Sequence, residues 1–109
     1  MSDLKQLATQ YFETFSNKDL DGLEDMFTDD VSLRDWTRSA TGKIGMLAAN
    51  KDIFDSVNTI TATPVALYEE GDTVIAELVI LVNDNESLLV VDVIKFRDNK
   101  ISSVIAYRG

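Results

Sequence analysis

The chain has 109 residues and a mass of 12.1 kDa, the size of one compact domain spanning residues 1–109. It carries 19 acidic and 10 basic residues, so its formal net charge is −9, which argues against a nucleic-acid partner. Cysteine and histidine are both absent, which excludes disulfides, thiolate metal sites and histidine-based catalysis. The longest apolar run, residues 78–82, is too short to span a membrane, and no signal peptide is recognisable. We therefore expect a cytoplasmic protein without membrane contact.

Apolar residues at helical spacing predict three helices in the first half of the chain. From Leu4 to Phe15 they recur at intervals of three and four residues, which is typical of an amphipathic helix, with Ser2 as its N-cap. Asp19 caps a second, shorter helix that ends at residues 29–30. A third helix is expected at about residues 42–56. Its inward side would be formed by Met46, Leu47, Asn50, Ile53, Phe54 and Val57.

Strand patterns follow the second helix and fill the rest of the chain. Residues 31–36 alternate with period two and predict a strand, followed by a polar loop at residues 37–41. Pro64, the only proline, indicates an edge strand or a bulge. Four further strands, joined by tight turns, are expected at residues 59–68, 73–82, 88–96 and 100–107. This order of elements predicts an α+β domain with a mostly antiparallel sheet and its helices on one side.

The strands at residues 73–82 and 88–96 are apolar on both faces. Helices can cover one face, and the other face must also be removed from water. A homodimer interface on the outer face of the sheet would achieve this. The alternative is a tightly curled sheet that hides both faces within one monomer. Glu77 interrupts the first of these strands, and we expect it on the outer face, with a place in a pocket as the alternative.

Three polar side chains interrupt faces that are otherwise apolar. Tyr11 lies on the apolar face of the first helix, Asp35 continues the inward phase of the first strand, and Asp92 lies in mid-strand. A buried carboxyl takes up a proton and can then donate a hydrogen bond, as a phenol does, while a carboxyl nearer water stays ionised and can act as a base. Two donors opposite one base are suited to proton transfer next to a carbonyl group. The structural alternatives are core packing for Tyr11, a turn or cap for Asp35, and an outward orientation for Asp92.

Three stretches of sequence carry a resemblance to a known superfamily: residues 11–23, 26–31 and 92–101. They resemble the nuclear-transport-factor-2-like superfamily, with its SnoaL-like and ketosteroid isomerase-like members, and their spacing is closest to the ketosteroid isomerases. In those enzymes a helix tyrosine precedes an Asp-Leu-Asp-Gly motif by eight residues, as Tyr11 precedes Asp19. The catalytic base follows the start of that motif by sixteen residues, as Asp35 does, and an aspartate lies four residues before a strand phenylalanine, as Asp92 does. Trp36 stands where those isomerases have proline.

The resemblance implies a curved, mostly antiparallel sheet wrapped around three helices in the N-terminal half, forming a conical pocket of the cystatin-like type. It implies Asp35 as the base, with Tyr11 and a neutral Asp92 stabilising an enolate oxygen. No metal and no organic cofactor is required. A small apolar carbonyl compound would enter the pocket. The expected lining residues are Phe15, Trp36, Phe54, Val90, Ile94, Phe96 and Tyr107.

The sequence therefore predicts a cofactor-free, isomerase-type enzyme that transfers a proton. Two alternatives use the same fold. One is a non-catalytic module for small-molecule binding or dimerisation, and the other is an enzyme of the polyketide cyclase or epoxide hydrolase type that uses the same pocket.

Overall fold

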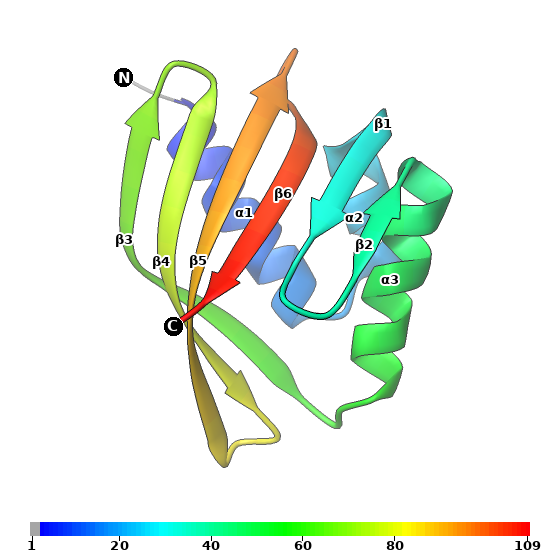
Figure 1. Ribbon diagram of the computed structural model, residues 1–109, viewed down its shortest axis with the longest axis vertical. Helices are drawn as coiled ribbons and strands as arrows, with labels where there is room; N and C mark the ends of the chain where they lie inside the picture. The colour runs from blue at the N-terminus through cyan, green and yellow to red at the C-terminus, as the bar shows by residue number, and fades with distance from the viewer. Residues whose placement is uncertain (1–2) are drawn as a thin grey trace.

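The computed structural model describes residues 3–109, which form three helices and one sheet of six strands (Figure 1). The helices are α1 (Asp3–Ser16), α2 (Leu20–Met26) and α3 (Lys43–Asp55). The strands are β1 (Phe27–Arg34), β2 (Ser39–Thr41), β3 (Ile60–Glu70), β4 (Thr73–Val82), β5 (Glu86–Arg97) and β6 (Lys100–Arg108). The predicted α+β class is confirmed, while the expected N-cap Ser2 lies outside the described residues.

The sheet is mixed, curved and unclosed, with strand order β2-β1-β6-β5-β4-β3. All neighbouring strands are antiparallel except β1 and β6, which are parallel. In Figure 1, α1 crosses behind strands β3 to β6 and α3 lies beside β1 and β2, so the helices cover one face of the sheet. None of the helices within residues 3–109 is long and apolar enough to cross a bilayer.

The core lies between the helices and the covered face of the sheet. Burial of each large apolar side chain contributes roughly 1.5–3 kcal/mol to folding. The largest fully buried side chains include Phe12, Leu23, Phe27, Met46, Ile94 and Ile101. These residues lie on all three helices and on strands β1, β5 and β6, so the core joins the N-terminal helices to the C-terminal strands.

The turns between the later strands form where their residue types predict. Asn83 and Asp84 both have positive φ angles, as do Asp98 and Asn99. Asparagine and aspartate tolerate this conformation, which tight antiparallel hairpins require. Pro64 lies on β3, which is the edge strand, and the pairing register of β3 shifts between Pro64 and Ala66. Both expectations for the proline are therefore confirmed.

The structure differs from the sequence-based prediction on both sides of the first strand, at the residues before it and in the loop after it. Helix α2 leads directly into β1 at Phe27, so Asp29 and Asp30 belong to the strand and do not end the helix. The reason is tertiary, because β1 pairs with β6 and the guanidinium of Arg97 binds the Asp30 carboxylate. The predicted loop at residues 37–41 is wrong in its second half, since residues 39–41 pair with β1 as β2.

Lys18 joins the first two helices to the end of the third. It has a φ angle of 55°, and its ammonium group donates hydrogen bonds to the carbonyl oxygens of Phe54, Val57 and Asn58, at 2.9, 2.8 and 3.0 Å. The last carbonyls of a helix have no partner within the helix. A cation at this position supplies the missing donors and is favoured by the helix dipole.

Replacing Lys18 by methionine should lower the free energy of unfolding by about 2 kcal/mol, because several charge-assisted hydrogen bonds are lost together. Urea denaturation at neutral pH measures the change. The matched control is Lys51→Met, which removes an exposed ion pair with Asp55 on the surface of α3 and should cost less than about 0.5 kcal/mol. Equal losses in the two variants would contradict a capping role for Lys18.

Candidate active site

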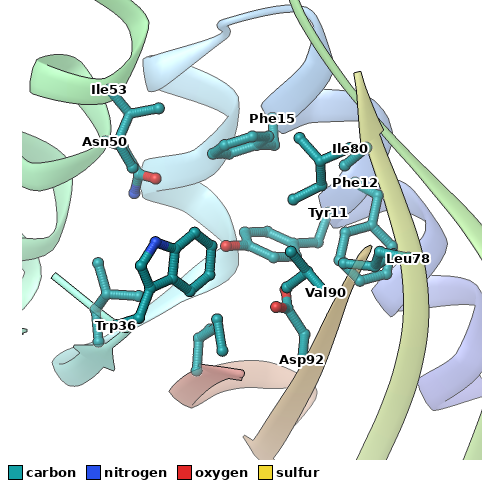
Figure 2. A pocket seen from close by; sticks show the side chains of 14 residues that line it. Tyr11, Phe12, Phe15, Trp36, Asn50, Ile53, Leu78, Ile80, Val90 and Asp92 are labelled. Atoms are coloured by element: carbon teal, nitrogen blue, oxygen red, sulfur yellow. The ribbon is translucent and has the colours of Figure 1, made fainter. Parts of the chain in front are cut away.

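A small cavity lies between the helices and the covered face of the sheet (Figure 2). Its volume is about 70 Å³, and its lining comes from α1, α3, strand β1 and the turn after it, and strands β3 to β6. The apolar lining residues include Phe12, Phe15, Leu33, Ile53, Leu78, Ile80 and Val90. Three polar side chains, Tyr11, Asn50 and Asp92, also line it. Pockets for drug-sized ligands are usually about 300–1,000 Å³, so this cavity suits a compact molecule.

Tyr11 reaches the cavity from α1. Its side chain is 5% exposed, and its ring packs against Phe12, Phe15 and Phe27 with centroid distances of 5.4, 6.4 and 6.1 Å. Within residues 3–109 its hydroxyl has no hydrogen-bond partner, and Figure 2 shows it directed toward Trp36. Burial raises the pKa of this hydroxyl well above its ordinary value, and the charge of Asp92 adds to the rise. Tyr11 is therefore a neutral phenol with a free donor.

Asp92 reaches the cavity from β5. Its neighbours on the adjacent strands are Ala76 and Ala106. Because both have small side chains, they leave the Asp92 carboxyl open to the cavity. The residue is 7% exposed, and no described residue, from 3 to 109, forms a hydrogen bond with its carboxyl. Burial raises the pKa of Asp92 to about 7, and the charge of Asp35 contributes to the rise. At neutral pH this carboxyl can therefore both accept and give up a proton.

Asp35 lies in the turn between β1 and β2 and is not among the residues that line the cavity. Its Oδ1 accepts hydrogen bonds from the Thr37 amide at 2.8 Å, the Thr37 hydroxyl at 3.1 Å and the Arg38 amide at 2.8 Å. Its own amide donates to the Arg38 carbonyl at 2.9 Å. These bonds close a tight turn that holds the intervening Trp36 against the cavity. Asp35 thus influences Asp92 through its charge, while its oxygen is engaged in the turn.

The expected lining residues divide into two groups. Phe15, Trp36 and Val90 line the cavity. Phe54 does not, because it lies behind Phe15, with ring centroids 5.1 Å apart in an edge-on arrangement. Phe54 therefore supports the wall of the cavity without forming its surface.

The remaining three expected lining residues lie elsewhere, which corrects the sequence-based expectation. Ile94 and Phe96 face inward on β5 but are packed into the core beyond the cavity. Tyr107 is 59% exposed and belongs to the outer face of the sheet, because it pairs with Val91, the residue before the inward-facing Asp92. Strand alternation shows which face of the sheet a side chain lies on, but its position along the strand decides whether it lines the cavity.

Asn50 is the polar lining residue that the sequence analysis did not assign to the site. It is 2% exposed, and its Nδ2 donates to the Met46 carbonyl oxygen at 3.0 Å. The signal was an amide at an inward position of α3, between apolar neighbours one helical turn before and after it. As for metals, residues 3–109 contain no group of three or more acidic, histidine or cysteine side chains arranged to hold an ion.

A curved, unclosed sheet with three helices on one face, and an apolar cavity between them, is typical of the nuclear-transport-factor-2-like class. The profile of the SnoaL-like domain family matches residues 8–104, and the chain belongs to this family. A comparison with curated protein sequences gives no match. The resemblance found in the sequence is thereby confirmed at the level of the superfamily and the fold.

Several solved structures share the fold at low sequence identity. A presumed ketosteroid isomerase from Kribbella flavida DSM 17836 superposes with a TM-score of 0.86 at 18% identity, covering 98% of this chain and 78% of that one. A presumed polyketide cyclase from Sinorhizobium meliloti gives 0.84 at 17% identity, with coverages of 97% and 94%. An LEH-like epoxide hydrolase from M. tuberculosis gives 0.86 at 13% identity, with coverages of 98% and 83%. These proteins differ in reaction type, so the shared fold does not select one reaction.

Proposed function

We propose that the protein is a cofactor-free enzyme of the ketosteroid isomerase-like type, which moves a proton on a small apolar carbonyl compound through an enolate. One observation carries this proposal: the Asp92 carboxyl and the Tyr11 hydroxyl face the same apolar cavity, and neither has a hydrogen-bond partner within residues 3–109. Both oxygen-bearing groups are open to the cavity, so a ligand with complementary groups can bond to them. A carboxyl with a pKa of about 7 is also suited to general acid–base catalysis.

In the proposed reaction, the Tyr11 hydroxyl donates a hydrogen bond to the carbonyl oxygen of the substrate. The ionised form of Asp92 removes the α-proton, and the protonated form returns it at another carbon. The hydrogen bond from Tyr11 becomes stronger as negative charge develops on the oxygen, because the lining of the cavity is mostly apolar. Each step therefore uses a group that already faces the cavity.

The roles of the two carboxyls, Asp35 and Asp92, can also be assigned differently within the same reaction. The ketosteroid isomerase resemblance implies Asp35 as the base and a neutral Asp92 as a second donor. Two observations favour Asp92 as the proton carrier: Asp92 lines the cavity, and Oδ1 of Asp35 already accepts three hydrogen bonds in its turn. Asp35 would then act by its charge and by holding Trp36.

Hydrogen–deuterium exchange at the α-carbons of a panel of small enolisable ketones, followed by NMR, tests the proposal. The wild type should accelerate exchange over buffer between pH 6 and 8, around the pKa of Asp92. An epoxide in the same panel would reveal hydrolase activity as diol formation. Exchange no faster than buffer across the panel would remove the basis for a proton-transfer enzyme.

Tyr11→Phe should lower the catalysed exchange rate about a hundredfold, because a single donor to an oxyanion typically contributes this much or more. The variant keeps the ring that packs against Phe12 and Phe27, so its free energy of unfolding should change little. Exchange rates of variant and wild type, measured with the same ketone, give the ratio. An unchanged rate would show that the Tyr11 hydroxyl does not contact the reacting oxygen.

The small volume of the cavity favours a second candidate, a non-catalytic module that binds a compact ligand. A cavity of about 70 Å³ accommodates only a few non-hydrogen atoms. Saturable binding of small ketones without any acceleration of exchange would support this candidate.

We further propose that a second copy of the chain covers the outer face of the sheet. The described helices lie on the other face (Figure 1). Ile75, Leu89 and Tyr107 are exposed on this one. Glu77 also lies there, as expected, and accepts a hydrogen bond from the Tyr68 hydroxyl at 2.6 Å. Contiguous exposed apolar surface on a sheet is typical of an interface.

Leu89→Lys should convert the proposed dimer into a monomer, because a lysine at the centre of an apolar interface would be desolvated without a partner. Sedimentation velocity at micromolar concentration measures the change. Ile44→Lys is the matched control, since Ile44 is 88% exposed but lies on α3, away from the outer face. A monomeric wild type, or an equal effect of both substitutions, would contradict the interface.

A further inference from the structure

Asn50 places a hydrogen-bond acceptor in the cavity that the proposed proton transfer does not use. Its Nδ2 donates to the Met46 carbonyl oxygen at 3.0 Å. A carbonyl oxygen can only accept, so the amide nitrogen must face Met46, and Oδ1 is left for the other side. Figure 2 shows the amide directed into the space bounded by Phe15, Tyr11 and Trp36.

Nothing in the described part of the chain satisfies this acceptor. Asn50 is 98% buried, since only 2% of its surface is exposed, and no donor from residues 3–109 forms a hydrogen bond with Oδ1. Its neighbours in the cavity wall, Phe15 and Ile53, are apolar. No buried side-chain nitrogen or oxygen atom in the described residues lacks a hydrogen-bond partner, so Oδ1 is open to the cavity, where a ligand that supplies a donor can reach it.

The cavity is therefore polar at two separate places. Asn50 lies on α3, whereas Tyr11 and Asp92 lie on α1 and β5, and Figure 2 shows Asn50 and Asp92 on opposite sides of the Trp36 ring. The Tyr11 hydroxyl is a donor, so it fits a carbonyl oxygen, and Asp92 is the base that the proposed proton transfer places at the α-carbon. Oδ1 of Asn50 is an acceptor, so it fits a hydroxyl group. The wall between them is apolar, and the volume of about 70 Å³ limits the connecting skeleton to a few carbons.

We propose that the ligands of this cavity are short hydroxycarbonyl compounds, with the carbonyl oxygen at Tyr11, the α-carbon facing Asp92 and the hydroxyl group donating to Oδ1 of Asn50. Asn50 is then the residue that determines specificity for the hydroxyl end. The fate of the carbonyl end rests on the proposed function, whereas the preference for a hydroxyl group concerns binding alone.

The test compares pairs of ketones in which a hydroxyl group replaces a methyl group: hydroxyacetone with butanone, and 4-hydroxybutan-2-one with pentan-2-one. Dissociation constants come from NMR titration of the wild-type protein. In at least one pair the hydroxyketone should bind roughly tenfold more tightly, which corresponds to one additional hydrogen bond. Equal binding within both pairs would overturn the inference, as expected if Oδ1 only holds a water molecule.

Two variants attribute the preference to Asn50. Asn50→Leu keeps the approximate size of the side chain and removes the acceptor, so the affinity ratio should fall to one or below. Ile53→Val, another lining residue on α3, should keep the wild-type ratio. A ratio unchanged in Asn50→Leu would also overturn the inference. If that variant does not fold, the two wild-type pairs still decide the question.

The same ketones separate this inference from the proposed function. A hydroxyl preference without accelerated exchange would support the ligand class and contradict the proton-transfer proposal. Accelerated exchange without a hydroxyl preference would do the reverse.

Discussion

Asp92→Asn should lower the rate of catalysed α-proton exchange by about 10³-fold, whereas Asp35→Asn should lower it less than tenfold. Asparagine at position 92 keeps the shape of the side chain but cannot carry the proton, and a positioned general base typically contributes about 10²–10⁴-fold. Asparagine at position 35 keeps an oxygen acceptor for the amides of Thr37 and Arg38, so the turn beside Trp36 is preserved. Initial rates of deuterium exchange with one ketone measure both effects.

The pH dependence provides the control for this comparison. The charge of Asp35 raises the pKa of Asp92, so removing that charge should lower it. Exchange that depends on ionised Asp92 rises as pH passes through its pKa, and its midpoint in Asp35→Asn should therefore move from about 7 to lower pH. If Asp35→Asn is instead the more damaging substitution while the fold is retained, Asp35 is the base, as the ketosteroid isomerase resemblance implies.

Asp92→Asn should also stabilise the folded protein, and the gain should depend on pH. The pKa of Asp92 is about 7 when folded, compared with an ordinary value of 3.8. Between these values the native state holds a proton that the unfolded state has released, so the stability of the wild type falls as pH rises from about 4 to about 7. A shift of about three pKa units corresponds to about 4 kcal/mol. The variant, which does not titrate there, should exceed the wild type by this additional amount at pH 8 relative to pH 4.

Free energies of unfolding from urea denaturation at pH 4 and pH 8 measure this effect. The comparison between variant and wild type removes contributions that both proteins share, including that of Asp30, whose pKa is lowered by its hydrogen bond to Arg97. Asp84→Asn, in the hairpin between β4 and β5, is the control for exchanging an exposed aspartate for asparagine. A difference between Asp92→Asn and wild type that is the same at both pH values would show that the carboxyl is already ionised at pH 4.

Much of the fold follows from local rules that a sequence displays. The spacing of apolar residues in α1 identifies its buried face, and Tyr11 falls on that face. Residue types that adopt positive φ angles mark the hairpin at Asp98 and Asn99, and Pro64 marks an irregular edge strand. Asp92 is also found in this way, because a carboxyl in an apolar phase must face something other than water. These features depend on neighbours within a few residues along the chain.

The placement of the site residues depends on contacts between distant segments. Strand alternation puts both Asp92 and Phe96 on the inner face of β5, but packing against the helices leaves only Asp92 at the cavity. Asp35 has the right phase for an inward position, yet hydrogen bonds with Thr37 and Arg38 close a turn there. Periodicity specifies the direction of a side chain, whereas its position along the cavity, and its partners, are set by how helices and strands pack together. The sequence therefore contains the polar groups, and the assembled fold selects the ones that meet.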